Sequence, residues 1–118
     1  MAVALTRLPA LTRTEFQRHW SDVHAPLVGS LAEVLGIRKY LQLHSFPDEA
    51  TAGIAASGGA PAPYDGLAEI WYDSLDTLAE RMKNADARAA ARRLRDDEAN
   101  FIDREKTRAW WSTEHAVL

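Results

Sequence analysis

The sequence predicts an α+β fold whose elements follow the order strand, helix, strand, strand, helix, strand. Apolar residues recur at three- and four-residue spacing between Phe16 and Leu35, which is the period of a buried helix face. Residues 37 to 46 instead alternate with the period of a strand, and Ser74 introduces a second helical stretch. This order is typical of a ferredoxin-like βαββαβ fold, with a four-stranded antiparallel sheet and helices on one face.

Composition narrows the class of protein. The 118 residues fit a single domain, 1–118, with 47% apolar and 26% charged residues. No apolar run is long enough to span a bilayer and no signal peptide is recognisable, so we expect a cytoplasmic protein with no membrane association. The absence of cysteine excludes disulfides and thiolate chemistry. The net charge of -3 argues against a nucleic-acid partner and favours a small molecule.

The first half of the chain contains a strand and a helical region. Residues 2 to 8 are apolar and bounded by proline, as in a first strand. Thr12 and Glu15 have the spacing of a capping box and predict a helix start. Pro26 disfavours helical geometry at the preceding residue, so we expect a break or kink after His24. Gly36 then ends the second helical piece.

The middle of the chain supplies two strands. The alternation from 37 to 46 places Tyr40 and His44 on one face. Residues 66 to 72 form the next strand, with Glu69 and Trp71 on one face and Ile70 on the other. The Gly- and Pro-rich segment between them, 47–65, has no periodicity and is expected to be a flexible loop, either a functional lid or disordered.

The second half repeats helix and strand. Ser74 caps one helix and Asn84 interrupts it, after which an Ala- and Arg-rich helical piece runs to about Asn100. The charged residues of that piece predict a solvated face with local ion pairs. A last strand covers 107 to 115. Both sheet faces carry large apolar residues, so the face without helices is predicted to pair with a second copy as a homodimer.

Two residues are the candidate catalytic groups. His24 lies on the apolar stripe of the first helix, and an imidazole can move a proton in either direction near neutral pH. The alternative is a core histidine bonded to a carbonyl that Pro26 leaves free. Tyr40 faces the same layer and can hold a carbonyl or enol oxygen, or it can be a purely structural aromatic.

Five further residues are candidates for substrate binding. They are aromatic or ionisable and lie near these elements: Trp20, His44, Glu69, Trp71 and Tyr64. Structural roles compete for each, such as an ion pair for Glu69 and packing for Trp71. Asp65 is expected to be a solvent or turn residue. His19 is about 140° from His24 on an ideal helix, which argues against a shared metal site, so no metal is predicted.

Several short segments resemble the EthD family. They are His19-Trp20, Val23-His24-Ala25-Pro26-Leu27, residues 36 to 40, residues 64 to 71, Phe101-Ile102-Asp103 and residues 114 to 118. The resemblance implies a dimeric α+β barrel with a pocket between sheet and helices. It also implies hydrophobic substrates, often aromatic or polyketide-derived molecules or lactones, handled without a cofactor.

Three functions stay open at this point. The first is a cofactor-independent lyase or isomerase in which His24 moves a proton and Tyr40 steadies an enolate-like charge during decarboxylation, dehydration or isomerisation. The second is an oxidoreductase, a cofactor-free monooxygenase that deprotonates a phenol or anthrone for reaction with oxygen. The third is a non-catalytic ligand-binding or accessory protein.

Overall fold

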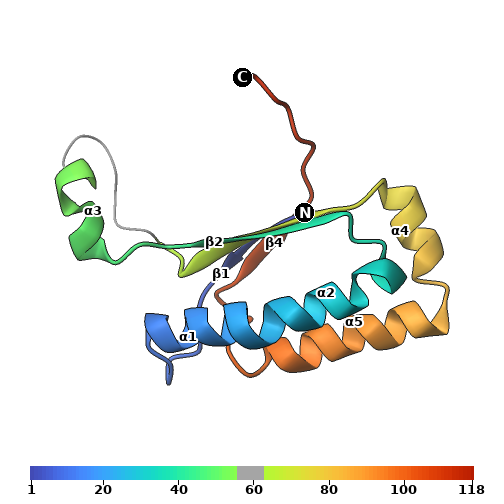
Figure 1. Ribbon diagram of the computed structural model, residues 1–118, viewed down its shortest axis with the longest axis horizontal. Helices are drawn as coiled ribbons and strands as arrows, with labels where there is room; N and C mark the ends of the chain where they lie inside the picture. Colours follow the sequence, from blue (N-terminus) through green and yellow to red (C-terminus); the bar gives the residue numbers. More distant parts are fainter. Residues whose placement is uncertain (56–62) are drawn as a thin grey trace.

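The protein contains a four-stranded antiparallel sheet that helices cover on one face. A computed structural model describes residues 1–55 and 63–118. The strands are β1 (Ala2–Leu5), β2 (Lys39–His44), β3 (Gly66–Trp71) and β4 (Arg108–Trp110), and they lie in the order β2-β3-β1-β4. Helices α1 (Arg13–His19), α2 (Ala25–Leu35) and α5 (Ala85–Glu98) lie beneath one face of the sheet, whereas the C-terminal segment leaves on the opposite side (Figure 1). The ferredoxin-like α+β prediction is confirmed.

The first helical region begins where its capping box predicts. Thr12 Oγ1 accepts a hydrogen bond from the Glu15 N–H at 3.1 Å, and the Thr12 N–H donates to Glu15 Oε1 at 3.0 Å. The region consists of α1 (Arg13–His19), a π-helical turn at Trp20–His24 and α2 (Ala25–Leu35). Gly36 ends it with the left-handed φ of 71° that glycine tolerates.

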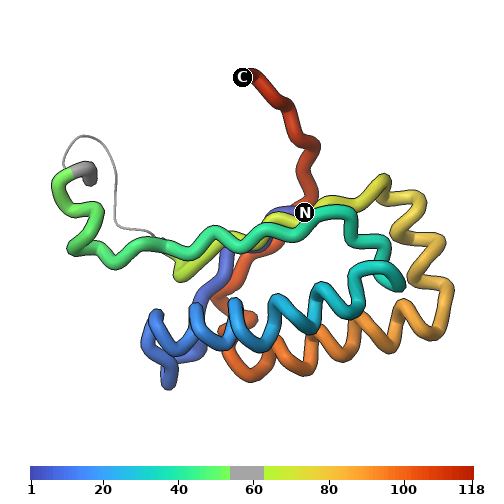
Figure 2. The backbone as a smooth tube through the Cα atoms, viewed as in Figure 1, coloured from blue at the N-terminus to red at the C-terminus, as the bar shows by residue number. Residues whose placement is uncertain are grey.

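The expected break at Pro26 does not occur. The backbone stays helical through His24 and Ala25, and the Ala25 N–H donates to the carbonyl of Trp20, five residues earlier. Pro26 occupies the start of α2, where a missing N–H costs little. The chain therefore accommodates the proline by widening one turn, and α1 and α2 continue in one direction (Figure 2).

The second helical region matches the predicted caps. Helix α4 (Leu75–Arg81) follows Ser74, and α5 (Ala85–Glu98) follows Asn84, whose side chain accepts from two backbone N–H groups. Helices α2 and α5 lie side by side and share a cluster that includes Leu31, Leu35 and Ala90. A second cluster under the sheet contains the largest buried aromatic side chains, Phe16, Trp20 and Phe101.

Two expected elements differ from the structure. The segment predicted as a structureless loop contains α3 (Asp48–Ala55). Residues 48 to 55 lack proline, and the acidic Asp48 and Glu49 in the first turn favour a helix start. The part of that prediction that concerns residues 56–62 lies outside the described residues. The last strand is only three residues long, and the chain beyond Trp110 has no regular structure. No helix in the described ranges is long and apolar enough to cross a membrane.

Candidate functional site

A cavity of about 540 Å³ lies between the sheet and the helices. Its walls are largely apolar side chains, including Val28, Leu35, Ile70 and Leu94. Its polar lining residues include His24 from the π-helical turn, Tyr40 from β2, and Glu98 from the end of α5. An apolar cavity with a few converging polar groups is the usual form of a small-molecule site.

His24 is held by a carboxylate. Its Nδ1 lies 2.8 Å from Asp97 Oδ2, and the other oxygen of Asp97 lies 2.9 Å from Nε2 of His19. His24 is only 6% exposed, whereas a quarter of the His19 side chain is exposed to solvent. Burial raises the pKa of the Asp97 carboxyl, but hydrogen bonds from His24, His19 and Asn100 outweigh it, so this pKa is below its ordinary value.

The Asp97 contact fixes the tautomer of His24. An ionised carboxylate only accepts hydrogen bonds, so the neutral imidazole carries its proton on Nδ1 and leaves Nε2 with a free lone pair. Nε2 has no hydrogen-bond partner among the described residues. Every fully buried side-chain nitrogen or oxygen of these residues does have a partner, so Nε2 cannot be fully buried. Nε2 therefore retains some exposed surface, and because His24 lines the cavity, we place that surface there.

The π-helical turn explains why the two histidines meet one carboxylate. On an ideal α-helix, residues five apart lie about 140° from each other. A π-helical turn closes its hydrogen bonds over five residues, so positions 19 and 24 come onto the same side. The expectation that His19 and His24 face different ways is therefore wrong. Among the described residues no cluster of three or more His, Asp or Glu side chains is suited to a metal ion.

Tyr40 lines the cavity and keeps a hydroxyl proton to donate. Its oxygen accepts hydrogen bonds from Trp20 Nε1 at 3.0 Å and from Gln42 Nε2 at 3.2 Å. A phenol that accepts twice keeps its own O–H to donate. Burial raises the Tyr40 pKa, only partly opposed by the hydrogen bonds from Gln42 and Trp20, so the phenol stays neutral at physiological pH. Trp20 in turn packs on the Gly66 backbone, where a Cβ would approach its ring within 2.4 Å.

Comparison with known proteins agrees with this architecture. The sequence model of the EthD domain matches residues 8–105. The chain belongs to the EthD family. It is also similar to a crystal structure of an EthD family protein from Bacillus halodurans, at 20% identity over 86% of this chain and 84% of the other, with a TM-score of 0.52. No curated protein sequence matches the chain.

In this EthD protein the five expected binding residues do not surround one site. Trp20 lines the cavity. His44 stacks on the Trp20 ring at 4.6 Å between centroids and contacts the Gln42 amide oxygen at 2.9 Å, but it does not line the cavity. Burial lowers the His44 pKa, which favours the neutral ring.

Glu69 and Trp71 lie on the other face of the sheet. Strand alternation turns Ile70 toward the cavity, so its neighbours on β3 point away from the helices. Trp71 Nε1 donates to Glu114 at 2.7 Å, and the Lys39 ammonium lies 4.7 Å from the Trp71 ring centroid. Both residues line a separate hollow of about 730 Å³ on that opposite face. The expectation that they bind the same ligand as His24 and Tyr40 is corrected by this placement.

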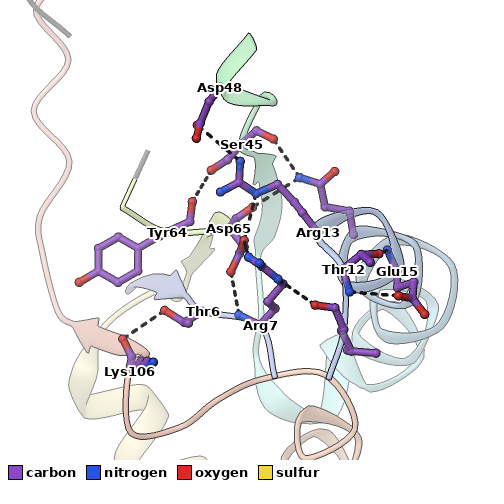
Figure 3. A network of polar contacts seen from close by, with 12 residues as sticks. Thr6, Arg7, Thr12, Arg13, Glu15, Ser45, Asp48, Tyr64, Asp65 and Lys106 are labelled. Carbon is purple, nitrogen blue, oxygen red and sulfur yellow. Dashed lines mark hydrogen bonds and ion pairs between the residues drawn. The ribbon is translucent and has the colours of Figure 1, made fainter. Parts of the chain in front are cut away.

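Tyr64 lies in a polar network at the edge of the sheet (Figure 3). Its carbonyl accepts from the Ser45 hydroxyl at 2.7 Å, and its ring points away from Asp65 and does not line the cavity. Asp65 is buried rather than a solvent residue. It accepts hydrogen bonds from Arg7 Nη1 at 2.6 Å and Arg13 Nε at 3.0 Å.

The Asp65 network ties α1 to the sheet. Burial raises the Asp65 pKa, but hydrogen bonds from Arg7 and Arg13 outweigh it and lower the pKa overall. Both carboxylate oxygens accept hydrogen bonds, from Arg7 just after β1 and from Arg13 in α1. Arg13 also reaches toward Asp48 at 3.9 Å. These contacts join elements rather than converge on a cavity, so we assign the network to the fold.

Sequence reasoning missed the two carboxylates that complete the site. Asp97 and Glu98 occur in a run of charged residues that was interpreted as a solvated helix face. Asp97 instead reaches the two histidines, and Glu98 lines the cavity. One signal was available. Both carboxylates lie at the C-terminus of α5, where the helix dipole disfavours negative charge.

Proposed function

We propose that this EthD protein is a cofactor-independent enzyme that moves a proton on a small hydrophobic substrate. The observation that carries the proposal is the pairing of His24 Nδ1 with Asp97, which leaves Nε2 as a proton acceptor at the cavity. Tyr40 offers a hydroxyl proton from the facing strand. A base and a hydrogen-bond donor in one apolar cavity suit a reaction that passes through an enolate.

The chemistry divides between the two residues. His24 Nε2 removes a proton from a carbon next to a carbonyl, and the Asp97 carboxylate stabilises the resulting imidazolium. The Tyr40 hydroxyl donates to the carbonyl oxygen as negative charge develops there. Decarboxylation, dehydration and isomerisation each contain such a step. The cavity volume and apolar walls support a flat, aromatic or lactone-like molecule as the substrate.

A homodimer belongs to the same proposal. The sheet face opposite the helices exposes Leu41, Leu43 and Trp110 by 40 to 48% each. The C-terminal segment leaves on that side, and α1, α2 and α5 lie on the other (Figure 1). Exposed apolar side chains on the two outer strands, β2 and β4, favour a second copy on this face. Sedimentation or light scattering that finds a monomer at micromolar concentration would contradict the dimer.

The test is a thermal-shift screen against phenols, anthrones, lactones and aromatic ketones. A ligand that binds the native state raises the melting temperature by mass action. We compare the wild type with His24→Gln and with His115→Gln, a control on an exposed histidine. Compounds that bind the wild type are then assayed for turnover in air and without oxygen.

Each outcome has a defined meaning. The proposal predicts anaerobic turnover that His24→Gln abolishes and His115→Gln leaves unchanged. Turnover that needs oxygen would favour the cofactor-free monooxygenase. Saturable binding without turnover, with an affinity that His24→Gln does not change, would favour a binding or accessory protein. A cytoplasmic location and the absence of a cofactor stay predictions.

A further inference from the structure

Glu98 is a half-buried carboxylate without a protein partner. It is the last residue of α5 and lines the cavity with His24 and Tyr40. No residue in the described part of the chain donates a hydrogen bond to its side chain, and none of its oxygens is completely buried. Its carboxylate is therefore free to contact whatever occupies the cavity.

The position is unfavourable for a carboxylate. Burial removes water from it, and the carbonyl end of α5 carries negative partial charge. The neighbouring Asp97 has the same helix position but is compensated by two histidines. Burial raises the Glu98 pKa, and the positive charges of Arg104 and Arg95 oppose this only in part. An acid in a cavity that accepts no hydrogen bond from the described residues is a candidate for proton transfer.

We infer that Glu98 is a second catalytic residue, which delivers a proton to the substrate after His24 has removed one from a different atom. The inference rests on the proposed function. It selects among the three reaction types, because a donor and an acceptor at separate places in one cavity suit a proton shift along an unsaturated carbonyl compound. Two exposed arginines, Arg95 and Arg104, border the same cavity and stabilise Glu98 once it is ionised.

A β,γ-unsaturated ketone would be converted to its conjugated isomer by two proton transfers. His24 Nε2 takes a proton from the carbon between the carbonyl and the double bond, and the electron pair moves to the carbonyl oxygen. The Tyr40 hydroxyl holds the resulting dienolate. The carboxylic acid of Glu98 then protonates the far carbon, the electron pair returns from oxygen, and the double bond becomes conjugated. Proton exchange with water restores neutral His24 and protonated Glu98.

The test uses cyclohex-3-enone and a bicyclic octalone with the same β,γ-unsaturation as probes. Conversion to the conjugated ketone is followed by ultraviolet absorbance, and the origin of the new hydrogen by NMR in D2O. The variants are Glu98→Gln, Glu98→Asp, which keeps the acid on a shorter side chain, and Asp96→Asn. Asp96→Asn is the matched control because it removes one exposed negative charge from the same helix.

The expected results separate one proton-transfer group from two. The wild type should place a solvent deuteron on the far carbon, and Glu98→Gln should lower the rate at least about 100-fold. The residual product of Glu98→Gln should retain the transferred hydrogen, because His24 alone must carry it. Glu98→Asp should be slower than the wild type but still deliver solvent deuterium, and Asp96→Asn should match the wild type.

Contrary results are equally distinct. An unchanged rate in Glu98→Gln, together with loss of rate in His24→Gln, would overturn the role of Glu98 and leave the proposed function intact. Unchanged rates in Glu98→Gln and in His24→Gln would overturn the role of Glu98 and the proposed function together. A wild type that converts neither ketone would overturn the proton-shift assignment, while the thermal-shift comparison at His24 still decides the proposed function.

Discussion

Substitution of Asp97 by alanine tests whether this carboxylate positions His24. The change removes the acceptor of three hydrogen bonds, at 2.8 Å from His24, 2.9 Å from His19 and 3.4 Å from the exposed Asn100. Water can replace the carboxylate at His19, where a quarter of the side chain is exposed, but hardly at His24, whose side chain is 7% exposed. The main cost is therefore a buried donor without a partner, about 1–3 kcal/mol.

Removal of a negative charge from the end of α5 opposes this cost by about 0.3–1 kcal/mol. We therefore expect Asp97→Ala to lower the free energy of unfolding by about 1–2 kcal/mol at pH 7. For a chain of this length that corresponds to a fall in melting temperature of roughly 4–8 °C. Urea unfolding followed by circular dichroism measures the change, and His19→Gln, which removes only the exposed partner, should cost less than about 1 kcal/mol.

The stabilisation that Asp97 provides should depend on pH. Because the pKa of Asp97 is lowered in the folded protein, its contribution is present above about pH 4 and is lost as the pH falls through the folded value. The difference between wild type and Asp97→Ala should shrink in that range. Turnover should fall together with stability, since His24 loses its fixed tautomer. An Asp97→Ala protein as stable and as active as the wild type would refute the positioning role.

Four further predictions concern separate parts of the molecule. Glu98→Gln should raise the free energy of unfolding at pH 7 by about 1 kcal/mol in urea titrations. The reason is that a carboxyl with a raised pKa destabilises the folded protein as the pH rises through the folded pKa. An unchanged free energy of unfolding would contradict the cost of burying Glu98. Asp65→Asn should cost about 2–3 kcal/mol, less than a fully buried ion pair because Arg7 and Arg13 are partly exposed, and should flatten the loss of stability below about pH 4 that the lowered Asp65 pKa produces. An acid-unfolding curve identical to the wild type would disprove this. Tyr40→Phe should lower turnover about 100-fold with little change in ligand-induced thermal shift, and steady-state kinetics on a confirmed substrate checks it. Leu43→Lys, at a side chain exposed by 45% in one copy, should convert the dimer to monomer in sedimentation, and an unchanged mass would place the interface elsewhere.

Local signals in the sequence determined most of the fold. The Thr12 capping box, the Ser74 cap and Gly36 mark helix ends where the structure has them. Strand alternation correctly separated Tyr40 from its neighbours and Ile70 from Glu69. Alternation does not say which face meets the helices, so it does not exclude Glu69 and Trp71 from the binding candidates, although both lie on the face opposite the cavity.

The site depended on features that periodicity does not show. A π-helical turn shifts the hydrogen bonds by one residue, and it alone brings His19 and His24 to one carboxylate. Pro26 marked the place of an irregularity but not its kind. Asp97 and Glu98 belong to a charged run of ordinary appearance, and their roles depend on contacts with an element more than 70 residues away.

The most direct test of the account is the protonation of the His24 ring in 15N-labelled protein, observed by NMR with and without a ligand from the thermal-shift screen. The account predicts a neutral ring protonated on Nδ1, with an Nε2 resonance that moves when the ligand binds. A neutral ring protonated on Nε2, or an Nε2 resonance that does not respond to any bound ligand, would contradict the assignment of His24 as the base of this cavity.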